Sequence, residues 1–235
     1  MVRIFCLKYG EKYYNYSHVN RLYQNIKDHL TIPFEFFCIT DNSKHINKNI
    51  KIINFDNNDI FIETFNKCRI YDPKIHINCK VLYFDLDVII HDNIDFLIDD
   101  IMYDGITTVC CTWTNAKRNQ RLGWTKNAWF QGNSSIIGFY GNDPEVHYIY
   151  NHYKKNHMGI VNHYKGGDDI YLLGQLFEIN QFKPGHIYSY KMGYINDTFA
   201  NDKFKFDMEP WKFRHNVPIC ILNQISTKEK LKYLI

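Results

Sequence analysis

Apolar and polar positions alternate with two different periods along the first hundred residues. Apolar positions at helical spacing (Val19, Leu22, Tyr23, Ile26, Leu30) predict a helix over 17–30, with Ser17 as its cap. A shorter helix is predicted within 63–73, where it stops before Pro73. Short apolar runs predict strands at 2–7, 34–41, 51–55 and 80–87. Strands that alternate with helices indicate a mostly parallel sheet covered on both faces, an α/β fold.

The second half of the chain has a more mixed pattern. Strands are expected at 105–113 and 133–141, followed by a helix over 142–156 with Asp143 at its N-cap and Pro144 in its first turn. A glycine-led helix start follows in "GGDDIYLLGQLF", and the tail predicts one strand and then a charged helix. Because the sequence contains no repeat, low-complexity segment or linker, we expect a single domain over residues 1–235.

Composition narrows the class of protein. Hydrophobic residues make up 45% of the 235, which is ordinary for a globular core. The net charge is only +3, and no run of five basic residues occurs, so a nucleic-acid partner is not expected. The seven cysteines lie mostly in apolar runs without a Cys-x-x-Cys pair, which indicates a reducing compartment. No apolar run is long enough for a membrane span or a signal peptide, so we expect a soluble, cytoplasmic protein.

The segment "KVLYFDLDVIIHDNID" places two carboxylates, Asp85 and Asp87, inside an apolar run. Side chains two apart on a strand project to the same side, so both carboxylates would face one site. Two close carboxylates repel, and burying them is costly unless they share a cation at the carboxyl end of the strand. Mg²⁺ and Mn²⁺ favour such oxygen ligands. The alternative is a polar strand end in which Asp87 starts a turn.

The same segment resembles the Asp-x-Asp region of GT-A glycosyltransferases, in particular the glycogenin-like sugar transferases. Further short segments are similar, in order, to a group of predicted bacterial and phage glycosyltransferases: "CLKYGEKYYNYSHVNRLYQNIKDHL", "FCITD", "FNKCRIYDP", "GNSSIIGFY", "GGDDIYLL" and "HIYSYK". The resemblance implies a Rossmann-like, mixed but mostly parallel sheet flanked by helices. It also implies a nucleotide-binding half at 1–100 and an acceptor and donor-sugar half at 101–235.

The resemblance further implies roles for individual residues. The implied nucleotide-binding residues are Tyr9, Gly10, Tyr13, Thr40, Asp41 and Lys67. Of these, Lys67 would face the diphosphate as a mobile point charge. Asn133 and Ser134 would bind the donor sugar. Asp169, or Asp168 beside it, would orient or stabilise the reacting sugar. Each has a simpler reading as well: Asp41 as a turn residue, Lys67 as a solvated lysine, "QGNSS" as a turn, and the paired aspartates as partners of a helix dipole.

The expected metal site departs from the family pattern. Related proteins carry a histidine just after the last core strand as a third metal ligand, and here Asn223 stands in that place. Either Asn223 binds the metal through its amide oxygen, or His215 substitutes, or substrate phosphates and water complete the site with Asp85 and Asp87.

The implied activity is transfer of a sugar from a nucleotide-diphosphate donor, with UDP as the nucleotide, to a hydroxyl of a glycan, protein or small-molecule acceptor. The resemblance favours Mn²⁺ or Mg²⁺ as cofactor and retention of configuration. The polar, basic segment 112–132 is a candidate acceptor or donor loop. Four tryptophans in the second half fit sugar stacking or ordinary core packing: Trp113, Trp124, Trp129 and Trp211.

Three alternatives remain open. A haloacid-dehalogenase-type phosphatase would use Asp85 as nucleophile and Asp87 as acid and base, but that family places the pair near its N-terminus. A protein that holds a nucleotide sugar or glycan without turnover is also compatible with Asn223. A nucleotidyltransferase would begin with a glycine-rich phosphate loop, which "KYGEKYYNY" is not.

Overall fold

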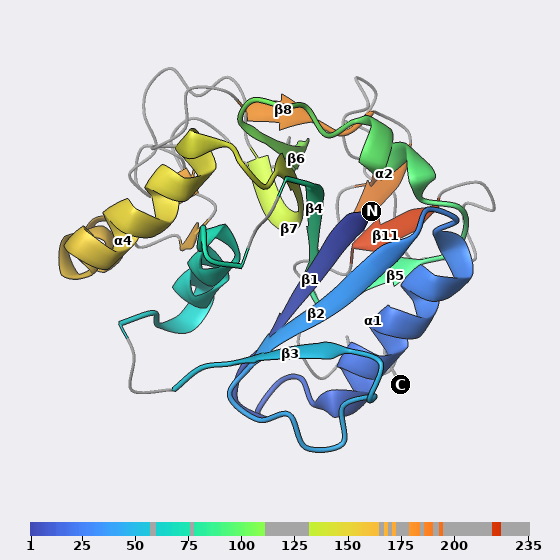
Figure 1. Cartoon of the computed structure of the whole chain (residues 1–235), viewed down its shortest axis with the longest axis horizontal. Helices are drawn as coiled ribbons and strands as arrows, with labels where there is room; N and C mark the ends of the chain where they lie inside the picture. Colours follow the sequence, from blue (N-terminus) through green and yellow to red (C-terminus); the bar gives the residue numbers. More distant parts are fainter. Residues whose placement is uncertain are drawn as a thin grey trace.

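The computed structural model describes residues 1–56, 60–75, 78–110, 132–164, 167–168, 171–172, 179–183, 186–189, 193–194 and 218–221. Within these residues a seven-stranded sheet has the order β3-β2-β1-β4-β7-β6-β8. Its strands are β1 (Val2–Lys8), β2 (Phe34–Thr40), β3 (Lys51–Asn54), β4 (Lys80–Phe84), β6 (Ile106–Cys110), β7 (Gly132–Tyr140) and β8 (Ile179–Gln181). Only β7 runs antiparallel to its neighbours in this described sheet, which confirms the expected mixed, mostly parallel α/β fold (Figure 1).

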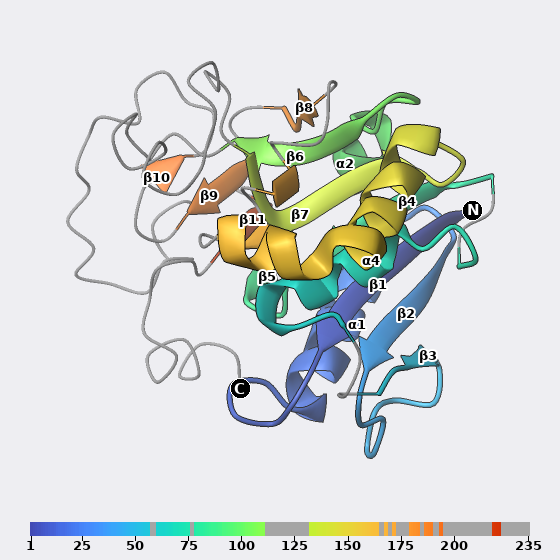
Figure 2. The same cartoon turned by 90° about the vertical axis from the view of Figure 1, so that its left-hand side faces the viewer.

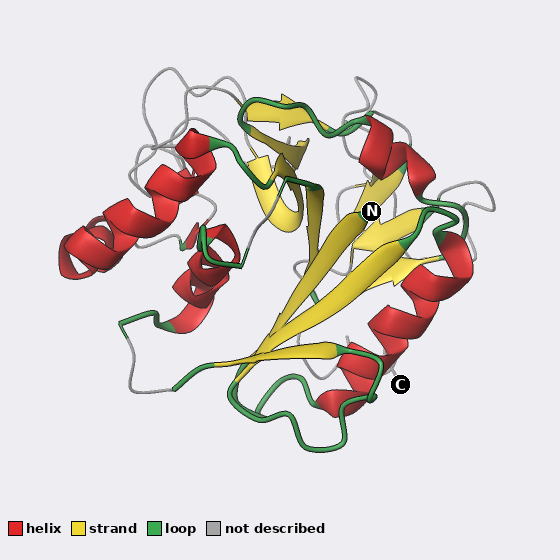
Figure 3. Ribbon diagram, viewed as in Figure 1, coloured by secondary structure: helices red, strands yellow, loops and turns green. Residues whose placement is uncertain are grey.

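Helices cover both faces of the sheet (Figures 1 and 3). Helix α1 (Tyr16–His29) packs on one face. The 3₁₀ helix η1 (Glu63–Tyr71) and helix α4 (Pro144–His163) pack on the other. Strand β1 is buried on both sides: Ile4 lies in the cluster that includes Leu22 of α1, whereas Phe5 lies in the cluster that includes Phe65 of η1 and Tyr153 of α4. This double burial explains why Ile4, Phe5, Cys6 and Leu7 of β1 are apolar without alternation.

The ends of the two long helices test the capping predictions. Asp143 caps α4 as expected, because its Oδ1 accepts a hydrogen bond from the backbone N–H of Glu145 at 2.8 Å. The predicted cap Ser17 of α1 is wrong. Asn15 is the N-cap, with extended backbone and a side chain that accepts from the Ser17 N–H at 2.9 Å, while His18 Nδ1 accepts from the Asn15 N–H at 3.1 Å. This reciprocal pair satisfies two of the helix's free donors.

A second, smaller sheet adjoins the first and has the order β10-β9-β11-β5 within the described residues (Figure 2). Its strands are β5 (Val88–Ile90), β9 (Ile187–Ser189), β10 (Gly193–Tyr194) and β11 (Ile219–Ile221), and α2 (Asp95–Asp99) follows β5. Strand β5 pairs with β11 so that Val88 lies opposite Ile221. The described part of β11 therefore ends beside the residue that follows Asp87. In the part of the chain that the structure describes, no helix is long and apolar enough to cross a membrane.

Candidate active site

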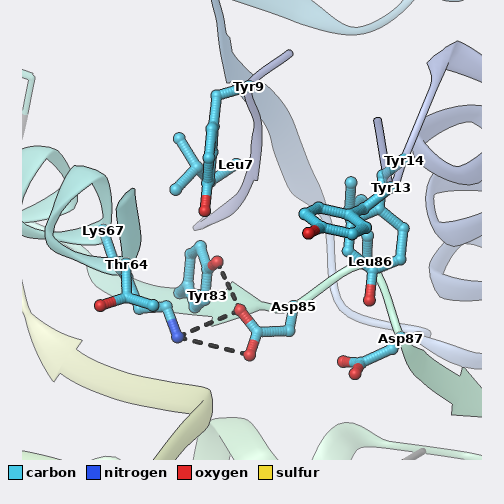
Figure 4. Close-up of a pocket in the computed structure, with 10 residues that line it drawn as sticks. All are labelled: Leu7, Tyr9, Tyr13, Tyr14, Thr64, Lys67, Tyr83, Asp85, Leu86 and Asp87. Atoms are coloured by element: carbon cyan, nitrogen blue, oxygen red, sulfur yellow. Dashed lines mark hydrogen bonds and ion pairs between the residues drawn. The ribbon is translucent and has the colours of Figure 1, made fainter. Parts of the chain in front are cut away.

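The two aspartates of the Asp-x-Asp segment lie in a turn between β4 and β5. The expectation that they belong to the strand is wrong, because β4 ends at Phe84, where the chain begins to cross into the second sheet. The N–H of Asp85 still bonds to the β7 carbonyl of Ser135 at 2.8 Å, and the Val88 N–H closes the turn on the Asp85 carbonyl at 3.3 Å. Both carboxylates nevertheless line one cleft, as expected (Figure 4).

This cleft opens at the carboxyl ends of β1 and β4 and has a volume of about 200 Å³. Its lining residues are Leu7, Tyr9, Tyr13, Tyr14, Thr64, Lys67, Tyr83, Asp85, Leu86 and Asp87. Five of them were singled out from the sequence, and the tyrosines Tyr14 and Tyr83 were missed. Pockets for drug-sized ligands are typically larger, roughly 300 to 1,000 Å³. The described residues therefore enclose only part of a ligand the size of a nucleotide sugar.

Lys67 is the centre of a buried polar network on one side of the cleft. Its ammonium lies 3.1 Å from Asp85 Oδ1 and 3.3 Å from Asp168 Oδ2, and it donates to Ser134 Oγ at 2.6 Å. The Ser134 hydroxyl donates in turn to Asp168 Oδ2 at 2.6 Å. The side chains of Lys67 and Asp168 are both more than nine-tenths buried. One lysine thus neutralises two carboxylates that the sequence places about 80 residues apart.

The contacts of Asp85 limit how it can bind a further ligand. The Tyr83 hydroxyl donates to Asp85 Oδ1 at 2.6 Å, and the same oxygen faces Lys67 (Figure 4). Oδ2 is also within 3.3 Å of the Lys67 ammonium. A carboxylate oxygen has about two acceptor positions, so Oδ2 retains room for one more ligand and Oδ1 does not. Asp85 can therefore contribute a single oxygen to a cation in the cleft.

Burial sets the protonation of the tyrosines around the cleft. Burial, and then the neighbouring Asp85, raises the pKa of the Tyr83 phenol well above its usual value. Burial also raises the pKa of Tyr14, and the charges of Asp87 and Asp85 add to the effect. The pKa of Tyr9 is raised mainly by burial, against the opposing effect of Lys67. These phenols stay neutral at physiological pH. The Tyr83 hydroxyl already donates to Asp85, so Tyr9 and Tyr14 are the ones that can donate a hydrogen bond to a ligand in the cleft.

Arg21 of α1 supports the Asp-x-Asp turn from outside the cleft. Its guanidinium donates to the Leu86 carbonyl at 2.8 Å and, through both terminal nitrogens, to the Val88 carbonyl at 3.3 Å. Burial lowers the pKa of Arg21 to about 10, an effect that the charge of Asp87 opposes, so the group is protonated at neutral pH. The sequence did not predict the contact between Arg21 and Leu86. The spacing of apolar residues in a helix gives no information about a partner 65 residues away.

Three of the predicted nucleotide contacts are not among the residues that line the cleft. The N–H of Gly10, a residue with φ of 58°, donates to Asp41 Oδ2 at 2.9 Å, and buried Lys8 lies 3.8 Å from Asp41 Oδ1. The Thr40 hydroxyl bonds to the backbone of Asn42. The two contacts of Asp41 connect the end of β1 and its following loop to the loop after β2. A nucleotide contact at Gly10, Thr40 or Asp41 stays a prediction.

The remaining predicted residues divide into three groups. Ser134 and Asp168 belong to the Lys67 network. Asn133, near the start of β7, makes a local hydrogen bond in which its Oδ1 accepts from the Ser135 N–H at 3.1 Å. Asp169, Asn223, His215, the four tryptophans and segment 112–131 lie outside the described residues. Among the residues that are described, no group of three or more histidine, cysteine or acidic side chains is arranged to hold a metal ion.

Gly167 holds the backbone that places Asp168 in the network. Its φ is 96°, and a Cβ at this position would lie 2.8 Å from Thr64 Oγ1 of η1. We expect Gly167→Ala to lower the free energy of unfolding by about 1–3 kcal/mol, from backbone strain and the clash with Thr64. Urea denaturation measures the loss. Gly159→Ala is the matched control, because a Cβ at that position meets nothing within 4 Å and alanine favours the helix. If the two variants were equally stable, the expectation would be contradicted.

The mixed, mostly parallel sheet and its flanking helices form a fold of GT-A glycosyltransferase type. Two crystal structures of the galactosyltransferase LgtC share it. One is a complex with donor and acceptor sugar analogs (TM-score 0.62, 14% identity, 99% of this chain and 95% of that one). The other is an active-site mutant of LgtC (TM-score 0.62, 14% identity, 98% and 94% covered). No family model and no curated protein matches the sequence. At this identity the likeness establishes the fold.

Proposed function

We propose that this protein transfers a sugar from a nucleotide-diphosphate donor to an acceptor hydroxyl. The observation that carries the proposal is the meeting of Asp85, Asp87 and Lys67 in one cleft at the carboxyl edge of a GT-A-type sheet. In open α/β sheets ligands bind at this edge. The LgtC structure of the same fold was determined with donor and acceptor sugar analogs. We propose UDP as the nucleotide, a glycan, protein or small molecule as acceptor, and retention of configuration.

The carboxylates of the cleft suit a divalent cation that shares its ligands with a substrate. Mg²⁺ and Mn²⁺ are commonly bound through one or two carboxylates, with phosphates and water in the remaining positions. Asp87 would provide the principal ligand, and Asp85 one oxygen at Oδ2. Asn223 is the candidate for a further ligand, since it comes two residues after Ile221, which pairs with Val88. When bound, the cation would act as a Lewis acid on the leaving diphosphate.

The other residues of the cleft would bind and orient the donor. Tyr9 and Tyr13 stand at the mouth as partly exposed aromatic rings that a nucleobase can pack on. Lys67 contacts Ser134 and Asp168, which were both expected near the donor sugar. We therefore place the donor sugar beside this network, with Lys67 fixing the two side chains, rather than assigning the lysine to the diphosphate alone. Asp168 or Asp169 would orient the reacting sugar.

A thermal-shift panel of UDP-, GDP- and ADP-sugars, each with Mn²⁺ and with EDTA, tests the proposal. We expect a UDP-sugar to stabilise the protein only when Mn²⁺ is present, by about 2.7 kcal/mol when the ligand is at a hundred times its Kd. The proposal fails if no nucleotide sugar stabilises the protein with metal present. Binding without donor hydrolysis or transfer would instead indicate a non-catalytic binding protein. Release of phosphate from a simple phosphate ester, through a covalent intermediate on Asp85, would indicate the phosphatase alternative.

A further inference from the structure

The backbone around Asp87 is held by hydrogen bonds from two sides, in addition to the side-chain contacts of Asp85. On one side the Asp85 N–H bonds to the Ser135 carbonyl of β7. On the other side the guanidinium of Arg21 bonds to the carbonyls of Leu86 and Val88, the residues before and after Asp87. Asp87 thus lies between two carbonyls that one side chain holds.

Arg21 belongs to helix α1, which is held firmly in the fold. The helix packs against β5 and buries Val19, Leu22 and Ile26 in the core, and the Asn15 capping pair fixes its first turn. The planar guanidinium presents several N–H groups in a rigid fork, so it can bond two carbonyls at once, whereas the single ammonium of a lysine cannot reproduce that fork. The contact therefore transmits the rigidity of a buried helix to the Asp-x-Asp turn.

We propose that Arg21 is a positioning residue for Asp87, holding its carboxylate where a divalent cation of the cleft binds. The inference rests on the proposed function, because it takes Asp87 to be a cation ligand. The positive charge of Arg21 by itself would weaken the binding of a cation nearby. The contribution of Arg21 to the site is therefore geometric, and loss of the fork is expected to weaken cation binding even when the charge is kept.

Arg21→Lys separates these effects, because it keeps the charge and removes the fork. We expect Mn²⁺ affinity, measured by calorimetry on the full chain, to fall by about tenfold or more, as for other residues that orient metal ligands. We also expect faster amide hydrogen exchange in the peptide that contains Leu86 and Val88, with or without metal. Arg3→Lys is the matched control: Arg3 donates to the Ile75 carbonyl at 2.6 Å from the amino-terminal half of β1, away from the cleft.

The two readouts distinguish the possible outcomes. Unchanged exchange in the 85–88 turn, or unchanged Mn²⁺ affinity in Arg21→Lys while the wild type binds Mn²⁺, overturns the inference. A loss of affinity equal to that in Arg3→Lys also overturns it, since this would report general destabilisation. If the wild type binds no Mn²⁺ even with UDP present and exchange is still faster in Arg21→Lys, the cation site of the proposed function fails, whereas the support of the turn by Arg21 stands.

Discussion

Replacing Asp87 by asparagine is expected to abolish the Mn²⁺-dependent stabilisation by a nucleotide sugar and to lower transfer by about a thousandfold. Asp87 is buried at the cleft, and the residues on either side of it are held by Arg21. Asp85 already has Tyr83 and Lys67 as partners and can give a cation one oxygen at most. Asparagine removes the charge of the principal ligand with little change in shape. A loss of about 4 kcal/mol of transition-state stabilisation corresponds to the expected factor.

Donor hydrolysis and transfer assays with Mn²⁺ titration measure the effect of Asp87→Asn, and circular dichroism checks that the fold is kept. Asp99→Asn is the matched control, because Asp99 is an exposed carboxylate on α2 in the same acidic stretch of sequence. We expect this control to behave like the wild type. If Asp87→Asn retained both the Mn²⁺-dependent shift and near-normal transfer, the assignment of Asp87 as cation ligand would be wrong.

The sequence predicted the strands that build the cleft because each of them carries a strong local signal. Strands β1 and β4 each contain a run of four apolar residues, 4–7 and 81–84, that is buried on both faces, and the polar residues that follow them reach the same sheet edge. Asp85 and Asp87 were placed by this rule, whereas Tyr9 was placed through the resemblance. Lys67 was placed only through the resemblance, since a lysine in a short helix is most often solvated. In the structure it is buried, because two carboxylates from distant segments surround it.

The contacts that the sequence did not predict are those between segments far apart in the chain. Three residues near the Asp-x-Asp turn have no distinguishing feature in the sequence: Arg21 in a helix, Tyr14 in a loop and Tyr83 in a strand. Only the fold brings them to the turn. The position of Asp87 outside the strand depends on β5, which is only three residues long and pairs with β11, more than 120 residues later. Local periodicity cannot report pairing of that kind.

Lys67→Met is expected to lower the free energy of unfolding by about 3–5 kcal/mol, the range for removing one partner of a buried ion pair. Methionine has a similar length and leaves Asp85 and Asp168 facing each other without their shared cation. Lys183→Met is the matched control. Lys183 is paired with Asp100 at 3.3 Å, but its side chain is 64% exposed, and removing an exposed pair costs about 0–1 kcal/mol.

A double-mutant cycle with Asp168→Asn attributes the loss to the buried charges. Asparagine removes one of the two carboxylates that Lys67 neutralises, so we expect Lys67→Met to cost about 1–3 kcal/mol less in the Asp168→Asn background than in the wild type. Urea denaturation of the four proteins gives the coupling energy. Purely additive losses would show that Lys67 stabilises the fold by packing rather than by charge. A combined loss smaller than the sum of the two single losses would mean that the lysine holds together the polar groups beside the proposed donor-sugar site before any ligand binds.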